Sequence, residues 1–502
     1  MTDTNPTAEH EVVVVGAGFV GICAAIKLKE AGIEDFVILE RADDIGGTWR
    51  DNRYPGVAVD IPSVSYQFSF AQSGRWKRVF ARGAEVKAYV DEVFEDFGLR
   101  PHLRLQKHVV RTLFDEDHHW WWVETADGVT TSARFLISAH GVFGEAAKPA
   151  IEGIDDFEGT VIHTLAWDDE HDVAGERVAV IGTGASSVQL VPELAREAGQ
   201  VDVYQRTPIW LVPKPDLMVH PVARQVLRRV PPVRWAFRTA VSSGLEAAMY
   251  LGVTRHRQLP VLTRGIQRLS EAHLRSQVSD PEVRDRLRPT YDFGCKRPSM
   301  SNDYWRSFNR DNVDLVTDPI VRVHPHAIET ADGTKREIDT LVLATGFKFF
   351  EPDTVPPYTV EGEGEQVIAD YWREHGFQAY EGVSVPGYPN FFLVPGPYFA
   401  TSWSWLVMAE SRTTHIVRAI TRARSHGATY SAVRPEAHDR YVAEVRGALP
   451  NLLFLSGDCS GSNTYYIGDD GEVSIVRPQS SVTAWWRART YSHDDYELRG
   501  TA

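Results

Sequence analysis

The chain has 502 residues, a formal net charge of −15 and an apolar share of 43%. This length exceeds what one compact core usually organises, so we expect two or three domains. The acidic balance argues against a nucleic-acid partner. The three cysteines lack metal-ligand spacing and predict no disulfide framework, which is typical of a reducing cytoplasm.

The N-terminal segment 1–11 is polar and acidic, unlike a signal peptide, and no window holds about 18 uninterrupted apolar residues. We therefore expect a cytoplasmic protein without a membrane span. The nearest apolar stretch, 235–253, is interrupted by arginine, serine and glutamate and predicts an amphipathic helix. Because the basic stretch 224–234 lies beside it, a weak association with a membrane surface is left open.

The first predicted unit is a strand, a glycine turn, a helix and a second strand. Val12–Val15 predicts a buried parallel strand, and Gly16, Gly18 and Gly21 follow it as G-x-G-x-x-G. The second strand ends in Glu40. These glycines are needed for a tight turn, for approach to a pyrophosphate and for helix packing, and the carboxylate accepts hydrogen bonds from a ribose. The unit predicts a site for FAD or NAD.

A second unit repeats the pattern with one informative difference. Val178–Ile181 predicts the strand, and Gly182, Gly184 and Ser187 form the turn, with serine in place of the third glycine. At the offset of the first unit's carboxylate stands Arg206. A guanidinium pairs with a 2′-phosphate, so this unit predicts NADP, although an arginine that merely ends a strand remains an alternative. Two different dinucleotides indicate a flavoprotein reduced by NADPH, either a reductase or a monooxygenase.

A third motif lies between the two turns, in the segment FEGTVIHTLAWDD. Its fixed positions are Phe157, Gly159, His163, Trp167 and Asp168. This pattern resembles the fingerprint F-x-G-x-x-x-H-x-x-x-W-(P/D) of type I Baeyer–Villiger monooxygenases, which the family carries at the same place. We interpret the histidine as a clasp that holds the linker entering the NADP domain, and not as a general base.

Three further segments resemble the same family, at 46–63 (GGTWRDNRYPGVAVDIPS), 295–316 (CKRPSMSNDYWRSFNRDNVDLV) and 389–405 (PNFFLVPGPYFATSWSW). In the first of them the resemblance implies the cofactor-binding residues Gly47, Thr48 and Trp49. The family's C-terminal tryptophan–tyrosine pair is replaced here by Tyr465-Tyr466, so the substrates of better-known members do not transfer to this chain. The aromatic run 398–405 fits either an apolar ketone pocket or plain core packing.

The resemblance implies an FAD-containing, NADPH-dependent monooxygenase. Such an enzyme inserts one oxygen atom of O2 next to a ketone carbonyl, via a C4a-peroxyflavin, and gives an ester or lactone. Arg297 matches the catalytic cation and Asp60 the carboxylate that orients it; the alternative is a structural ion pair. Lys296 matches the lysine that joins Arg206 and Thr207 at the 2′-phosphate, with a solvated lysine as the alternative.

We therefore predict an α/β fold with two dinucleotide-binding, Rossmann-like domains and a helical insert in the NADP domain. The FAD domain is expected at 1–148 and 381–502, the NADP domain at 149–215 and 289–380, and the insert at 216–288. The partners expected are a small ketone and O2, with neither nucleic acid nor a metal. The oligomeric state is not predicted.

Three other functions compete with this prediction. A monooxygenase that oxidises sulfur or nitrogen remains the main alternative, and Trp167, Asp168 and Arg297 argue against it. A pyridine-nucleotide–disulfide reductase would need a redox cysteine pair near the flavin, and the sequence has no C-x-x-C or C-x4-C motif. A non-catalytic NADP sensor would not need the pair Asp60–Arg297.

Overall fold

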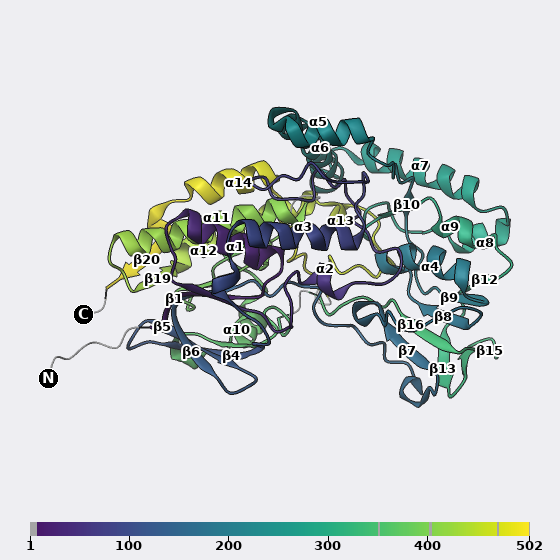
Figure 1. Cartoon of the computed structure of the whole chain (residues 1–502), viewed down its shortest axis with the longest axis horizontal. Coiled ribbons are helices and arrows are strands. Elements are labelled where there is room, and N and C mark those ends of the chain that lie inside the picture. The colour runs from purple at the N-terminus through teal and green to yellow at the C-terminus, as the bar shows by residue number, and fades with distance from the viewer. Residues whose placement is uncertain (1–7, 350–351, 401–403, 469–470, 501–502) are drawn as a thin grey trace.

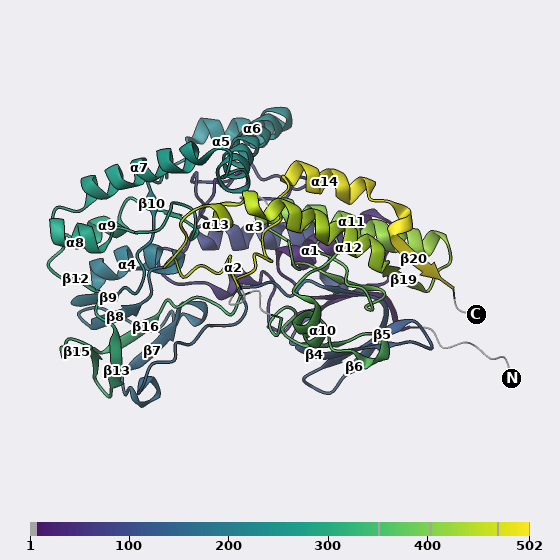
Figure 2. The same cartoon turned by 180° about the vertical axis from the view of Figure 1, so that it is seen from behind.

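The computed structural model describes residues 8–349, 352–400, 404–468 and 471–500. Within them the chain builds two large sheets of mainly parallel strands and three smaller sheets of two or three strands. Helices cover the first sheet, and a further group of helices lies along the edge of the molecule remote from both sheets (Figure 1). The view from behind shows the same arrangement (Figure 2). Strands that alternate with helices in this way make the α/β pattern expected from the sequence.

The first sheet has eight strands in the order β17-β4-β5-β6-β1-β2-β3, and β18 pairs with β6. Its strands are β1 (His10–Val15), β2 (Phe36–Leu39), β3 (Leu103–Arg104), β4 (Val109–Asp115), β5 (Trp120–Thr125), β6 (Thr130–Ser138), β17 (Thr359–Glu361) and β18 (Phe391–Leu393). The strands β1, β2, β3, β6 and β18 are parallel, whereas β5 is antiparallel to both of its neighbours. The runs Val12–Val15 and Phe36–Leu39 are buried throughout, which explains why both strands are apolar without alternation.

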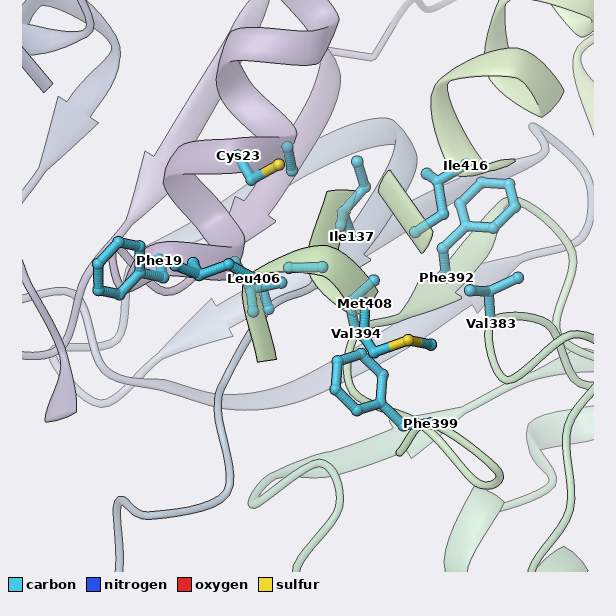
Figure 3. Close-up of a cluster of buried hydrophobic side chains, with 14 of the residues drawn as sticks. Phe19, Cys23, Ile137, Val383, Phe392, Val394, Phe399, Leu406, Met408 and Ile416 are labelled. Carbon is cyan, nitrogen blue, oxygen red and sulfur yellow. The ribbon is translucent and has the colours of Figure 1, made fainter. Parts of the chain in front are cut away.

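Helix α10 (Ile368–His375) packs on this sheet, and five further helices accompany it. They are α1 (Phe19–Glu30), α3 (Gly83–Asp96), α11 (Trp405–Ser425), α12 (Pro435–Ala448) and α14 (Ser481–Thr490). In the core between α1, α11 and the sheet, Phe19 and Cys23 of α1 lie near Leu406 of α11, and Ile137 and Phe392 come from β6 and β18 (Figure 3). This packing fixes the start of α1, and with it the first glycine turn.

The second sheet is entirely parallel, in the order β12-β9-β8-β16-β7. Its strands are β7 (Thr160–His163), β8 (Arg177–Ile181), β9 (Gln200–Tyr204), β12 (Val313–Val316) and β16 (Thr340–Leu343). The smaller strands nearby are β10 (Leu211–Val212), β11 (Ser299–Met300), β13 (Ile320–His324), β14 (Ala327–Thr330) and β15 (Lys335–Glu337). Helix α4 (Ala185–Glu197) follows β8, so the strand–turn–helix unit predicted from the second glycine turn is present.

The residues expected as a helical insert, 216–288, hold consecutive helices. They are α5 (Pro221–Arg229), α6 (Pro231–Met249), the π-helical turn η4 (Tyr250–Thr254), α7 (Pro260–Gln277) and α8 (Pro281–Arg286). Each of α5, α6, α7 and α8 begins with a proline. Proline is tolerated there because the first N–H groups of a helix make no hydrogen bond within the helix. Among the described residues no helix is long and apolar enough to cross a membrane. The remaining helices and strands are α2 (Thr48–Asp51), α9 (Tyr304–Ser307), α13 (Leu453–Ser456), β19 (Tyr430–Val433) and β20 (Tyr496–Arg499).

Two linkers join the sheets and pair with each other. Residues 145–148 leave the first sheet, and residues 345–348 come back from the second. The amide of Ala147 donates to the carbonyl of Gly346 at 3.0 Å, and the Thr345 hydroxyl donates to the carbonyl of Ala147 at 2.5 Å. Because the two crossings are hydrogen-bonded to each other, a rotation of one sheet against the other must bend both together.

The chain re-enters the first sheet earlier than expected. Strand β17 pairs with β4, with Thr359 opposite Arg111, although we expected residues 289–380 to stay in the second domain. A strand of three residues is too short to show a periodic pattern in the sequence. The other domain limits stay predictions.

The structure corrects the expectation drawn from the cysteines. Cys295 and Cys459 form a disulfide although 164 residues separate them, and only Cys23 is a free cysteine, buried in the core. The sequence could not reveal this pairing, because neither cysteine belongs to a short motif and their approach depends on the complete fold. The pairing also removes the cysteine argument for a reducing compartment.

Counting thiols tests the disulfide directly. Unfolded in denaturant without reductant, the protein should show one free thiol per chain, from Cys23, and three after reduction. The variant Cys459→Ser should show two thiols without reductant, because Cys295 then loses its partner. Three thiols in the unreduced wild-type protein would contradict the pairing.

Candidate active site

One cavity of about 1360 Å³ extends between the two glycine turns. Both turns contribute to its wall, as do the segments after β2 and β9 and the segment that follows Cys295. The predicted site residues that line it are Gly16, Gly18, Glu40, Gly47, Thr48, Trp49, Asp60, Gly182, Gly184, Arg206, Thr207, Lys296 and Arg297. The structure thus brings together residues predicted from four separate stretches of sequence.

The first turn has no room for side chains at two of its three glycines. Gly16 has φ +104°, and a Cβ on it would lie 2.6 Å from the carbonyl oxygen of Ala139. A Cβ on Gly21 would lie 1.8 Å from the carbonyl oxygen of Gly16. Both glycines are therefore needed for the turn itself. Gly18 lies on the cavity wall, where the backbone can approach a ligand.

Glu40 holds this turn in place from the end of β2. Its carboxylate accepts hydrogen bonds from the amides of Ala17 at 2.8 Å and Ala42 at 3.0 Å. Arg50 donates to the same carboxylate at 3.0 Å. The side chain is almost fully buried, yet it lines the cavity, so it remains an acceptor for a ribose hydroxyl.

The second turn tolerates its serine. Gly182 has φ +112°, and a Cβ on it would lie 2.4 Å from the carbonyl oxygen of Ala344, so this glycine is as constrained as its counterpart in the first turn. Ser187 occupies the third position and is fully buried, which shows that α4 leaves space there for a small side chain. Gly184 lines the cavity.

Two cations stand beyond this turn. Arg206 follows β9, and Lys296 lies close enough for the two like charges to interact. Burial, and secondly the charge of Arg206, lowers the pKa of Lys296 to about 8. Two neighbouring cations on a cavity wall, one of them desolvated, favour an anion between them, and a 2′-phosphate supplies one.

Thr207 is held by a residue that the sequence did not point to. Its hydroxyl accepts a hydrogen bond of 2.6 Å from the side-chain amide of Asn463, and its carbonyl accepts one of 2.6 Å from the Thr183 hydroxyl. Asn463 is 256 residues away in the chain and also lines the cavity. No motif marks Asn463, so only the fold reveals that the C-terminal loop contacts the second turn.

The pair Asp60–Arg297 lies on the same cavity wall. The Nε–H of Arg297 donates a hydrogen bond of 2.9 Å to Oδ2 of Asp60. The Nη2 atom of Arg297 lies 2.7 Å from the same oxygen. The charge of Asp60 is the main reason that the pKa of Arg297 is raised. Arg297 is therefore a permanent cation, oriented by Asp60 through two contacts and still 37% exposed to the cavity. The pair is present as predicted; its catalytic role stays a prediction.

The loop with Tyr465 and Tyr466 lies over this cation. Both side chains line the cavity, and their hydroxyl oxygens are 3.4 Å apart. Burial raises the pKa of Tyr465 far above its usual value, so the phenol stays neutral. The disulfide between Cys295 and Cys459 joins this loop to the segment of Arg297, and neither cysteine lines the cavity. The sulfurs are thus not placed to exchange electrons with a ligand there.

The fingerprint lies outside the cavity. Gly159 directly precedes β7, and a Cβ on it would lie 2.3 Å from the carbonyl oxygen of Asp339. The glycine therefore lets the chain approach the segment that leads into β16, the strand with which β7 pairs. Trp167 is buried in the core of the second sheet. Asp168 accepts a hydrogen bond from the amide two residues further on, at 3.0 Å. These contacts fix the entry of the chain into the second sheet.

His163 ends β7 beside the returning linker. Its Nδ1 accepts a hydrogen bond from the amide of Leu165 at 3.1 Å, and its ring lies 6.3 Å from that of Phe347. Burial lowers its pKa, while the carbonyl of Gly346 acts in the opposite direction. A neutral histidine that accepts at Nδ1 carries its proton on Nε2. It is suited to holding the linker and not to carrying charge.

Two dinucleotide turns that face one cavity, a carboxylate at the first and two cations at the second, define a flavin- and pyridine-nucleotide-dependent oxidoreductase. The family model for pyridine nucleotide-disulphide oxidoreductases matches residues 13–243. A Baeyer-Villiger monooxygenase of Streptomyces coelicolor is 35% identical over 96% of this chain and 92% of its own length. One of Pseudomonas aeruginosa is 35% identical over 91% of this chain and 86% of its own.

Solved structures agree with these relatives. Cyclohexanone monooxygenase from Rhodococcus sp. Phi1, bound to NADP+, is 26% identical and superposes with a TM-score of 0.86 over 98% of this chain and 99% of its own. The structure of OTEMO in complex with FAD and NADP is 26% identical and superposes with a TM-score of 0.87, over 98% of this chain and 100% of its own. This chain belongs to the Baeyer–Villiger monooxygenases. The family and the α/β fold expected from the sequence are thereby confirmed.

The cations beside the second turn lead to a prediction on coenzyme choice. Replacing Lys296 by methionine should lower kcat/KM for NADPH by about 10–100-fold at neutral pH, because a charged hydrogen bond is lost, and should leave NADH unaffected. Since the lysine is protonated below a pKa of about 8, wild-type kcat/KM for NADPH should fall as the pH rises through this value, and the variant should lose that step. Stopped-flow flavin reduction with both coenzymes measures this.

Lys214→Met is the matched control. It removes another partly buried lysine with a lowered pKa, but one that does not line the cavity. This variant should keep the wild-type preference for NADPH. An equal loss with NADPH and NADH in Lys296→Met would contradict a contact with the 2′-phosphate.

Proposed function

We propose that this monooxygenase binds FAD at the first turn and NADPH at the second, and oxidises an apolar ketone with O2 to an ester or lactone. The observation that carries the proposal is the oriented cation Arg297 on the wall of the one cavity that both turns share. The named relatives and the FAD- and NADP-bound neighbours support it.

The residues of the first turn fit FAD. The tight glycine turn and the buried carboxylate of Glu40 provide the pyrophosphate and ribose contacts that a dinucleotide needs. Gly47, Thr48 and Trp49 extend the same wall, and the Trp49 indole is fixed by a hydrogen bond of 2.9 Å to the Tyr66 hydroxyl. When bound, the flavin supplies the transfer of electrons from NADPH and the activation of O2.

Arg297 stabilises the negative charge that develops on oxygen when the ketone carbonyl is attacked. A fixed cation in a site sheltered from water needs no reorganisation as this charge appears. Asp60 takes two of the guanidinium's contacts through a single oxygen, so the remaining N–H groups are available to face the cavity. Asp60 is a positioning residue, because it acts through Arg297.

The cavity wall also favours an apolar substrate. Its aromatic and thioether side chains include Phe143, Phe347, Phe349, Phe399, Trp405, Met408 and Phe454. Within the aromatic run 398–405, Phe399 and Trp405 line the cavity and Tyr398 is buried in the core; residues 401–403 lie outside the described residues. Such a wall suits a bulky or aryl ketone.

The proposed reaction has a direct test. With NADPH and isotopically heavy O2, the protein should convert at least one member of a panel of cyclic, aryl and long-chain ketones to an ester or lactone with one heavy oxygen, detected by mass spectrometry. Replacing Arg297 by alanine should lower ester formation by about 10²–10³-fold while FAD stays bound. Arg82→Ala removes an exposed arginine outside the cavity and should change neither.

The same panel includes one sulfide and one tertiary amine. Sulfoxide or N-oxide with every ketone untouched would overturn the ketone proposal in favour of heteroatom oxidation. Unchanged ester formation in Arg297→Ala would leave the reaction in place and remove the arginine's role.

We further infer that His163 keeps the two crossings between the sheets in register. It ends β7 next to β16, whose continuation is the returning linker at 345–348. Its contacts are a backbone amide on one side and the region of Gly346 and Phe347 on the other. One nicotinamide must first reduce the flavin and then remain beside it, so this linker has to move without losing its alignment.

Replacing His163 by alanine should therefore slow flavin reduction and uncouple the enzyme, with release of H2O2, but leave FAD bound. His163→Asn should restore much of the coupling, because its side-chain oxygen can accept from the amide of Leu165. The control is His171→Ala, which removes a histidine bonded to Thr340 at the opposite end of β16. Stopped-flow reduction and H2O2 release report the effect, and normal values for both in His163→Ala would contradict the clasp.

A further inference from the structure

One stretch of this acidic chain is strongly basic. Residues 217–270 contain nine arginines, a single glutamate and neither lysine nor aspartate, in a chain whose net charge is −15. The glutamate, Glu246, does not oppose them at the surface, because it accepts a hydrogen bond of 2.7 Å from the amide of Ser481. This bond joins α6 to the first residue of α14. Seven of the nine arginines lie on helices α5, α6 and α7, and of these Arg238 is buried.

Large apolar side chains are exposed on the same helices and on α14. Trp235 and Phe237 of α6 are 60% and 48% exposed, and Trp485 and Trp486 of α14 are 45% and 61% exposed. Both views place α5, α6 and α14 along the edge remote from the sheets (Figures 1 and 2). We call the exposed side chains of these three helices the basic–aromatic face. Exposed apolar groups gathered in one region mark an interaction surface.

The cavity reaches these helices. Met249 of α6, Val253 of η4 and Ile266 of α7 line it. Ile266 is also 36% exposed. Helix α6, which belongs to the basic–aromatic face, therefore also forms part of the cavity wall.

We propose that the basic–aromatic face docks on the surface of an anionic lipid bilayer. Tryptophan and phenylalanine place apolar rings at the boundary of headgroups and acyl chains, and arginines pair with anionic headgroups. A second copy of this chain is a poorer match, because its own arginines would meet those of the first. The docking is independent of the reaction proposed above, and it sets an apolar cavity beside the phase in which apolar ketones dissolve.

The test is co-sedimentation of the FAD-loaded, full-length protein with vesicles. Binding should be strong with phosphatidylglycerol mixed into phosphatidylcholine, weak with phosphatidylcholine alone, and reduced by added salt. Two double variants should each lower the partition coefficient by about tenfold or more. The first combines Arg228→Glu with Arg229→Glu, and the second combines Trp235→Ala with Trp486→Ala. Their activity on a water-soluble ketone without vesicles should equal that of the wild type, which also shows that they fold.

Two matched controls accompany these variants. Arg310→Glu reverses an exposed arginine in the loop between α9 and β12, and Trp122→Ala removes an exposed tryptophan of β5 on the first sheet. Neither should alter binding. Wild-type protein that stays in solution with every vesicle, or variants that bind as well as the wild type, would overturn the proposal. A third result would also overturn it: the wild-type protein is a dimer in light scattering, the double variant Trp235→Ala/Trp486→Ala is a monomer, and neither protein binds vesicles.

Discussion

The ion pair of Asp60 with Arg297 is the contact on which the site depends. It joins residues 237 positions apart, one following α2 and the other following the helical insert. Both Nε and Nη2 of Arg297 contact the same carboxylate oxygen of Asp60, and these two contacts fix the orientation of the guanidinium. Removal of either partner would leave a charge in a largely apolar cavity, so the pair constrains position as well as charge. Every other part of the site must be placed around this fixed cation.

The surrounding structure supplies that placement by tying distant segments together. The disulfide fixes the segment of Arg297 to the loop that carries Asn463, and Asn463 in turn holds Thr207 at the second turn. The paired linkers connect the two sheets from the other side. A cation, a coenzyme turn and a C-terminal loop are thus coupled through covalent and hydrogen-bonded contacts. Coupling of this kind keeps the segment of Arg297, the second turn and the C-terminal loop in a fixed relation to one another.

The sequence predicted the parts of the site that depend on local spacing. Gly16, Gly182, Glu40 and Arg206 stand at offsets imposed by a strand–turn–helix unit, and such offsets can be read without a structure. The contact of Asn463 with Thr207 and the disulfide could not be read, because they join segments that only tertiary folding brings together. The short strand β17 was not predicted for another reason, because three residues are too few to show a periodic pattern of apolar side chains.

Net charge proved a poor guide to partners, because local placement decides what a surface attracts. The chain carries −15 overall, yet Lys296 and Arg206 form a cationic wall at the second turn, and Arg297 stands as a separate cation in the same cavity. Coulomb attraction weakens within about one Debye length of roughly 8–10 Å, so an anion near these groups experiences them and not the distant acids. The same reasoning applies to the helices at 217–270. An acidic protein can therefore present cations to a cavity and carry a basic surface elsewhere, each through a few neighbouring residues.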